Sequence, residues 1–168
     1  MDTFELISTR RSIRKFTDDP VSDDLIHKIL EAGIRAPSGL NNQPWRFAVI
    51  RDSELKSEIS VLTHYSKIVL GANVLIAVFL DNSASYDRTK DCQAVGACIQ
   101  NMLLSIHHLG LGAVWLGEIL KNRETVERIL EVPEGCELMA VIALGHPLEE
   151  KKAHGSRKPI EEVVIGRK

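Results

Sequence analysis

Three arginines and a serine lie within five residues near the start of the chain, where their side chains could bind an anion. The segment is Arg10-Arg11-Ser12-Ile13-Arg14. Guanidinium groups donate paired hydrogen bonds to phosphate, and a serine hydroxyl adds one more donor. A predicted helix opens at residues 2–7, and cations are also favoured at a helix C-terminus. The residues alone leave both interpretations open, a phosphate site and an ordinary helix end.

A second polar stretch, residues 36–45, reads Ala-Pro-Ser-Gly-Leu-Asn-Asn-Gln-Pro-Trp. Its two prolines and its glycine exclude a continuous helix or a central strand, so we expect a loop. Backbone N–H groups, the Ser38 hydroxyl and the side-chain amides of such a loop could bind the edge of a heterocycle. The alternative is an ordinary turn that leads Trp45 into the core, at the start of a strand over 46–50.

A third stretch, residues 109–117, is rich in glycine but carries no nucleotide-binding motif. Gly110 and Gly112 lack the third glycine of a dinucleotide fingerprint and follow a predicted helix, and the chain has no P-loop. Glycines do allow a backbone to approach a planar ligand closely. The alternative is a helix end that leads into an edge strand.

The spacing of apolar residues predicts alternating helices and strands that would position these three stretches. A helix is expected from the N-cap Ser22 to before Pro37. The β-branched run at 74–80 predicts a buried, central strand. A helix over 91–109 is apolar on several faces, which indicates burial within the domain or between two subunits, and Gly110 follows it. Further predicted elements are a helix after Ser53, a strand over 113–116, a helix capped by Asn122 and a strand over 138–144.

The composition favours one layered α and β domain over residues 1–168, because 168 residues with 44% hydrophobic content can bury a sizeable core. A net charge of −2 argues against a nucleic-acid partner. No leader pattern is present and the run at 74–80 is too short to cross a bilayer, so we expect a cytoplasmic protein without a membrane partner. Cys92, Cys98 and Cys136 lack metal-ligand spacing, so we expect buried free thiols and no metal site.

Taken together, the motifs resemble those of the nitroreductase family of FMN-dependent oxidoreductases. The resemblance covers nearly the whole chain, in family order. It implies an α+β fold, a three-layer α/β/α sandwich with a mixed, mainly antiparallel central sheet, in an intertwined homodimer whose C-terminal arm, about 149–168, wraps the partner. The residues that carry it are Arg-Arg-Ser-x-Arg at 10–14, Ala-Pro-Ser-Gly-x-Asn-x-Gln-Pro-Trp at 36–45, and the segments 99–104, 109–117, 143–147 and 157–159.

The resemblance also implies a site and a reaction. Bound FMN takes hydride at N5 from transient NADH or NADPH and passes it to a small electron acceptor in a ping-pong sequence, with no side chain acting as a catalytic residue. The backbone N–H of Gly117 faces N5, and Leu116 and Gly117 flank the ring. The implied phosphate ligands are Arg10, Arg11, Ser12, Arg14 and Arg157, and the implied contacts from the other subunit are Pro37, Ser38, Gly39 and Asn41.

Two features of the chain bear on these expectations. Only one helix separates the arginine segment from the 36–45 loop, so both are expected to reach one flavin only if two chains contribute. The chain is also short, with little room between Leu80 and Asp91 for the helices that cover the substrate in larger family members.

Two alternatives to an enzyme are an FMN carrier or sensor without turnover and a flavin-free domain that binds a phosphorylated partner.

Overall fold

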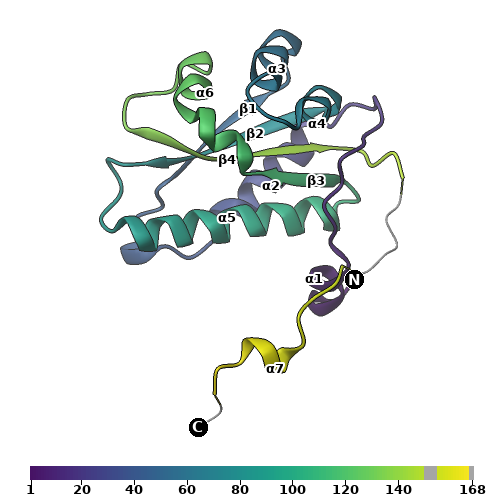
Figure 1. Ribbon diagram of the computed structural model, residues 1–168, viewed down its shortest axis with the longest axis vertical. Coiled ribbons are helices and arrows are strands. Elements are labelled where there is room, and N and C mark those ends of the chain that lie inside the picture. Colours follow the sequence, from purple (N-terminus) through teal and green to yellow (C-terminus); the bar gives the residue numbers. More distant parts are fainter. Residues whose placement is uncertain (150–154, 167–168) are drawn as a thin grey trace.

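The computed structural model describes residues 1–149 and 155–166, and its framework is a four-stranded sheet (Figure 1). The strand order is β1-β2-β4-β3, and each neighbouring pair is antiparallel. The strands are β1 (Trp45–Ile50), β2 (Val74–Asp81), β3 (Gly112–Leu116) and β4 (Cys136–Gly145). The prediction that β2 is buried and central is confirmed, because β2 pairs on both sides and its residues 74–80 are all buried.

Helices cover both faces of this sheet. The helices are α1 (Thr3–Thr9), α2 (Asp23–Ile34), α3 (Ser53–Ser60), α4 (Ser66–Gly71), α5 (Arg88–His108), α6 (Arg123–Ile129) and α7 (Ile160–Val163), with 3₁₀ turns η1 (Gly39–Asn41) and η2 (Glu118–Asn122). Figure 1 shows α2 and α5 on one face and α3, α4 and α6 on the other. Successive side chains of a strand point to opposite faces, so both faces of β2 must be apolar.

Two apolar clusters fill the spaces between the layers. Val74, Ile76 and Val78 of β2 pack with α2 and α5, whereas Leu75 and Ala77 pack with α3, α4 and α6. The predicted three-layer α+β sandwich with a mainly antiparallel sheet is confirmed. Its parallel component, within the described residues, is a single bridge between Ser12 and Ala113.

Several helix ends lie where the sequence places them, and others differ. The Ser22 hydroxyl accepts from Leu25 N and begins α2, and Gly110 has φ +76° directly after the end of α5, as expected. Helix α3 is capped by Asp52, one residue before the predicted start. Asn122 stands at the predicted N-cap position of α6, but its side chain makes no capping hydrogen bond and its amide donates to Leu62 O instead.

The cysteine prediction is confirmed only in part. Cys92, Cys98 and Cys136 are all free thiols, but only Cys98 is buried. Burial raises the pKa of the Cys98 thiol to about 12, so it stays protonated.

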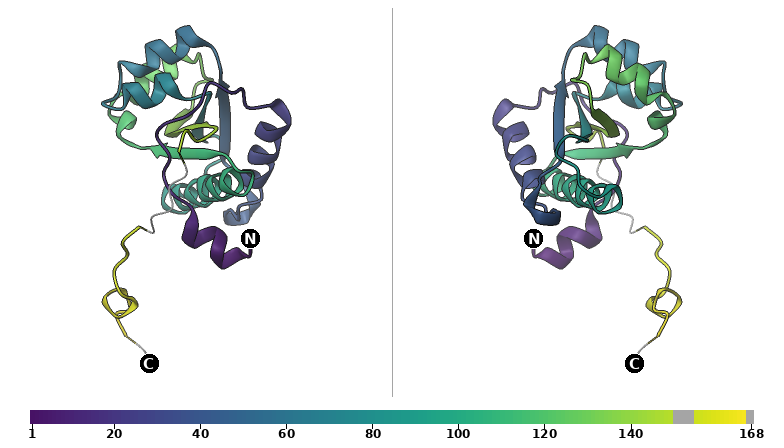
Figure 2. Two further views of the ribbon diagram at one scale, coloured as in Figure 1. Left: turned by 90° about the vertical axis from the view of Figure 1, so that its right-hand side faces the viewer. Right: turned by 90° about the vertical axis from the view of Figure 1, so that its left-hand side faces the viewer.

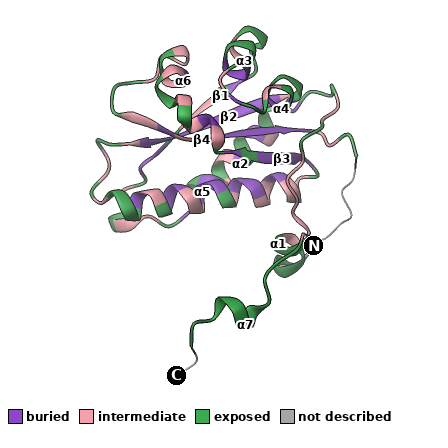
Figure 3. Ribbon diagram, in the orientation of Figure 1, coloured by how far each residue is buried: buried purple, intermediate pink, exposed green. Residues whose placement is uncertain are grey.

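The two ends of the chain lie outside the layered body. Figure 2 shows α1 and α7 projecting from it, and Figure 3 shows both as largely exposed. Their apolar side chains have little cover, since Phe4 is 80% exposed and Ile165 is fully exposed. Of the predicted arm, residues 150–154 and 167–168 lie outside the described residues. Within the described part of the chain, no helix is both long and apolar enough to cross a membrane.

Candidate functional site

The arginine segment lies along the free edge of β3. Ile13 N donates to Ala113 O at 2.9 Å, and Thr17 N donates to His146 O at 2.9 Å. Gly112 is required by this packing, because a Cβ there would lie 2.7 Å from Ile13 Cβ. The backbone of residues 12–17 is therefore fixed between β3 and the segment that follows β4.

A cluster of positive charge forms where this segment begins. Burial lowers the pKa of the Arg10 guanidinium, and the nearby charges of Arg11 and Arg157 lower it further. The Arg11 guanidinium packs against Gly155, where a Cβ would overlap it. Across residues 1–149 and 155–166, no carboxylate forms an ion pair with any of these three arginines. We call Arg10, Arg11 and Arg157 the arginine cluster, and its chemistry is that of an anion site.

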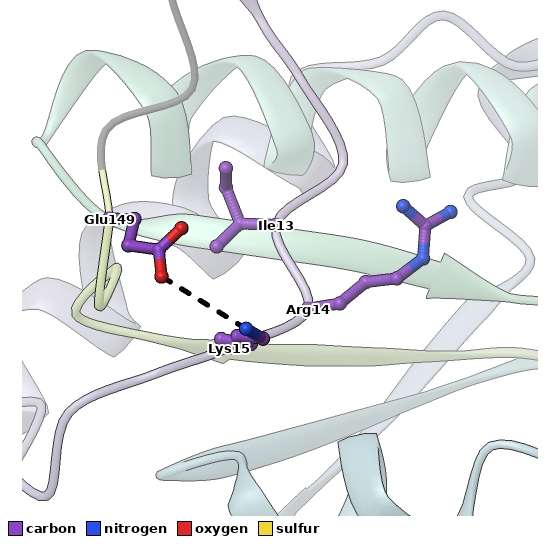
Figure 4. Close-up of a pocket in the computed structure, with 4 residues that line it drawn as sticks. All are labelled: Ile13, Arg14, Lys15 and Glu149. Atoms are coloured by element: carbon purple, nitrogen blue, oxygen red, sulfur yellow. Dashed lines mark ion pairs between the residues drawn. The ribbon is translucent and has the colours of Figure 1, made fainter.

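Next to the cluster, an open pocket of about 310 Å³ is lined by Ile13, Arg14, Lys15 and Glu149 (Figure 4). Lys15 Nζ lies 4.0 Å from a Glu149 oxygen, and Figure 4 shows Arg14 extending away from this pair. Arg14 is exposed, and its guanidinium donates to Ser12 O at 3.4 Å. Arg14 is therefore on the predicted segment but is not among the charges that lower the pKa of Arg10.

The end of β3 provides an open backbone position. Leu116 is buried, whereas Gly117 is exposed, and a Cβ on Gly117 would meet only Trp115 Nε1, at 3.9 Å. Gly110 serves the helix end and Gly112 makes room for Ile13. Of the three glycines, Gly117 is therefore the one whose backbone a planar ligand could approach closely.

Glu118 anchors the chain directly after Gly117. Its carboxylate accepts from Thr63 Oγ1 at 2.7 Å and from His64 N at 3.2 Å, and it pairs with Lys121. The hydrogen bonds from Lys121 and Thr63 lower the pKa of Glu118 to about 2. An ionised Glu118 therefore holds the turn that follows β3.

The loop between α2 and β1 has an unusual backbone. Leu40, Asn41 and Gln43 have φ values of 53°, 55° and 47°, a region that non-glycine residues rarely adopt. Gln43 N donates to the Ser38 hydroxyl at 3.0 Å, which closes the loop. Pro37 and Asn41 are exposed, so they are free to contact a ligand or another chain. We call residues 38–43 the strained loop.

The arginine cluster and the strained loop lie near opposite ends of α5. Asn42 of the strained loop contacts Asp91 near the N-terminus of α5, at 2.7 Å. Thr9, next to the arginine cluster, contacts His107 near the C-terminus, at 2.9 Å. His107 follows Asp91 by 16 positions in this helix, which corresponds to about 24 Å at 1.5 Å per residue. Within one chain the two groups are brought to the same helix but not to the same place (Figure 1).

Sequence reasoning missed three residues that support these groups: Asp91, Glu118 and Gly155. Asp91 could have been recognised from the sequence, because it is the only acidic residue between Arg88 and His108 and the residues that follow it up to Ile106 are uncharged. A carboxylate at the edge of a buried helix must find partners, which marks it as a junction between elements. Glu118 and Gly155 carry no comparable signal, because their partners lie far away in the sequence.

Comparisons with known proteins identify the family of the chain. A family model described as "Nitroreductase family" matches residues 7–64 and 60–146. A relative from Methanothermobacter thermautotrophicus, named "Putative NADH dehydrogenase/NAD(P)H nitroreductase", is 41% identical over 151 residues, which cover 89% of this chain and 79% of the relative.

Solved structures show the same similarity. A protein from Desulfovibrio desulfuricans, described as "a putative nitroreductase in complex with FMN", is 47% identical, with a TM-score of 0.93 over 100% of this chain and 98% of that one. The NADPH:FMN oxidoreductase of Vibrio harveyi, complexed with NAD⁺, is 26% identical, with a TM-score of 0.89 over 99% of this chain and 77% of that one. The resemblance predicted from the motifs is confirmed, and the chain belongs to the nitroreductase family.

Proposed function

We propose that the chain is an FMN-dependent oxidoreductase that uses NAD(P)H to reduce a small oxidised compound such as a nitroaromatic or a quinone. The enzyme class and the cofactors are those of the family: relatives are named NADPH-flavin oxidoreductase and FMN reductase, and the Desulfovibrio protein contains FMN. The observation in this chain that carries the proposal is the arginine cluster without carboxylate partners among the described residues.

The residues present fit FMN at its phosphate end. A phosphate monoester carries a charge of about −1.5 to −2 at pH 7 and offers strong acceptor oxygens. It would relieve the repulsion between Arg10, Arg11 and Arg157, which adds to burial in lowering the pKa of Arg10. Ser12 and Arg14, on the same extended segment, complete the proposed phosphate ligands.

The ring end of the proposed site lies at the end of β3. Leu116 and Gly117 would flank the ring, because Gly117 is the open backbone position of this stretch. Bound FMN would supply the redox chemistry, accepting hydride from NAD(P)H at N5 and passing it to the acceptor. The chain's own contribution is to hold the ring at a fixed turn, which Glu118 anchors through Thr63 and Lys121.

We further propose that each site contains residues of two chains. The strained loop contacts α5 at Asp91 and the residue next to the arginine cluster contacts it at His107, positions about 24 Å apart along the helix, so we infer that one flavin does not reach both groups of the same chain. A two-fold dimer would bring the loop residues Pro37, Ser38, Gly39 and Asn41 of the partner to the arginine cluster. The exposed apolar residues of α1 and α7 would be covered in such a dimer, with residues 149–168 as the arm.

The visible spectrum of the purified protein tests this function. We expect flavin absorbance from the protein as isolated or after FMN is added, bleaching under anaerobic NADH or NADPH, and recovery when a quinone or nitroaromatic is added. The same series run with each nicotinamide nucleotide gives the preferred donor.

The alternatives predict different results. A carrier or sensor would hold FMN that NAD(P)H does not bleach. A flavin-free phosphate-binding domain would stay colourless and would not retain added FMN on a desalting column. Either result would overturn the proposed enzyme.

A further inference from the structure

Asp91 is a fully buried carboxylate whose hydrogen bonds all point toward the strained loop and the turn beside it. It is 0% exposed. One oxygen accepts from Asn42 Nδ2 at 2.7 Å, and the other accepts from Ser85 Oγ at 2.6 Å and from Tyr86 N at 3.0 Å. Burial raises the pKa of Asp91, but these hydrogen bonds outweigh it and lower the pKa to about 2. A charged group is therefore held at this junction by its partners.

Asn42 connects this carboxylate to the strained loop. Its Nδ2 donates both to Asp91 and to Ala84 O, at 3.0 Å, so two acceptors define the orientation of the amide. Its Oδ1 is buried and has no hydrogen-bond partner among the described residues, which costs free energy. The orientation of the Asn42 side chain therefore satisfies its N–H donors and leaves its oxygen without a hydrogen bond.

The loop that Asn42 holds is costly in itself. Asn42 lies between Asn41 and Gln43, which both have positive φ, and such a backbone persists only where surrounding contacts determine it. Gly39 adds a second contact to the same turn, because a Cβ at Gly39 would overlap the Tyr86 ring. Strained backbone, an unpaired acceptor and a buried charge in one place are typical of a functional site, where position is favoured over stability.

We propose that Asp91, acting through Asn42, is a positioning residue that fixes the strained loop in its binding conformation before any ligand arrives. The inference rests on the proposed function in one respect, that this loop contacts FMN. Fixing the loop in advance removes an ordering cost from binding, so loss of the contact should weaken FMN binding more than it weakens folding.

Four variants separate this role from a purely structural one. Asn42→Leu keeps the size of the side chain and removes its donors. Asp91→Asn replaces the carboxylate by an amide and so places a second amide donor opposite Asn42. The double variant Asn42→Asp with Asp91→Asn exchanges the two groups, so that residue 91 donates and residue 42 accepts. The control is Lys56→Met, because the Lys56 ammonium makes a comparable 3.0 Å bond to Ala72 O, between α3 and the end of α4, outside both parts of the proposed site.

The readouts are the dissociation constant of FMN, the visible spectrum of bound FMN and the thermal midpoint. We expect each single change at the junction to weaken FMN binding by about tenfold, the loss of one hydrogen bond to a charged group, and to alter the visible spectrum. The reversed pair should recover part of the affinity. Lys56→Met should lower the thermal midpoint and leave both flavin readouts at their wild-type values.

The proposal is overturned if Asn42→Leu binds FMN with wild-type affinity and spectrum, or if the control weakens FMN binding as much. Asn42→Ala takes its place if the larger side chain blocks folding. Hydrogen exchange of the apoprotein separates this inference from the proposed function. Faster exchange of residues 38–43 in Asn42→Leu alone supports the positioning role even if the wild-type protein binds no FMN, whereas unchanged exchange contradicts it.

Discussion

The arginines of the cluster differ from most other arginines of the chain in what lies beside them. Arg46 pairs with Asp81 at 2.6 Å, Arg51 with Asp23 at 2.8 Å and Arg88 with Glu137 at 2.7 Å. Arg10 and Arg157 have like charges for neighbours, and the described residues offer them no carboxylate. Because these like charges have no carboxylate partner among the described residues, we propose that they bind an external anion.

Replacing single arginines tests this assignment. Arg157→Ala and Arg14→Ala should each weaken FMN binding by about 1.5–3 kcal/mol, the contribution of a charged hydrogen bond to phosphate. Fluorescence titration of the apoprotein with FMN measures the change. Arg128→Ala is the control, because Arg128 belongs to α6 on the far face of the sheet and, among the described residues, its guanidinium hydrogen-bonds to Thr125 alone, at 3.5 Å. Wild-type affinity in both test variants would remove the phosphate assignment.

Asp91 makes the stability of the protein depend on pH in a defined direction. Its pKa in the folded state is about 2, below the ordinary value of 3.8, so its ionised form stabilises the fold above about pH 4. That contribution should disappear as the pH falls from about 4 toward 2.

Urea unfolding of the wild type and Asp91→Asn at several pH values measures this effect. We expect the difference in unfolding free energy between them to be largest near pH 6 and to shrink below pH 4. Glu118 titrates in the same range in both proteins, so it cancels from the difference. A difference that stays constant down to pH 2 would contradict the assigned role of the Asp91 charge.

The sequence identified the residues with unusual local chemistry and missed those with distant partners. Residues 10–14 and the loop from Pro37 could be recognised from the sequence because arginines, and prolines with side-chain amides, are rarely so concentrated in a short segment. The contact of Asn42 with Asp91 spans 49 positions in the sequence, and no local pattern encodes it. The sequence also does not show that Gly110, Gly112 and Gly117 have different roles, because the contact of Gly112 with Ile13 forms only when the chain folds.

At the scale of elements, the edge of β3 is the part of the fold that sets the site. Residues 12–17 form neither a helix nor a full strand. They are held to β3 by one bridge and the hydrogen bond from Ile13 N to Ala113 O, and further along to the segment that follows β4. So short a pairing depends on close contact, and Gly112 provides it.

Gly112→Ala should therefore disturb both folding and binding. A Cβ 2.7 Å from Ile13 Cβ must push the arginine segment from the strand, at a cost of about 1–3 kcal/mol. We expect lower stability in thermal unfolding together with weaker FMN binding. Gly71→Ala in α4, where a Cβ would meet nothing within 4 Å, should change neither. A Gly112→Ala protein with wild-type FMN affinity would show that the segment is not placed by this contact.

Helices and strands could be predicted from the sequence where the spacing of apolar residues was regular. The strands β2 and β4 and the helices α2 and α5 were predicted because they form the core. The start of α5 was placed three residues late, since its first turn is polar and Asp87 caps it. Helix α4 was not predicted, because it has only six residues and no side-chain cap.

At the scale of the whole molecule, the separation of the two groups along α5 gives a test of shared sites. A chain with Arg10→Ala loses the arginine cluster, and a chain with Asn41→Ala loses a loop contact. If each site takes one group from each chain, a mixed dimer of the two variants has one intact site and one doubly damaged site.

Unfolding and refolding the two variants together should therefore restore about a quarter of the wild-type high-affinity FMN sites, since half of the dimers are mixed. Each variant refolded alone should show none. Equilibrium dialysis with FMN measures the number of such sites. A mixture that binds no better than its components would exclude a site built from two chains.

The length of α5 has a consequence for how this chain can change. In a shared site, α5 sets the distance between the arginine cluster that a chain contributes to one site and the strained loop that it contributes to the other. Inserting a single residue in α5 would move those ends apart by about 1.5 Å and rotate them by about 100°, which would misalign both sites of every dimer that contains the altered chain. Such an insertion would be dominant in a mixed population, and only a matching change in the partner could compensate for it.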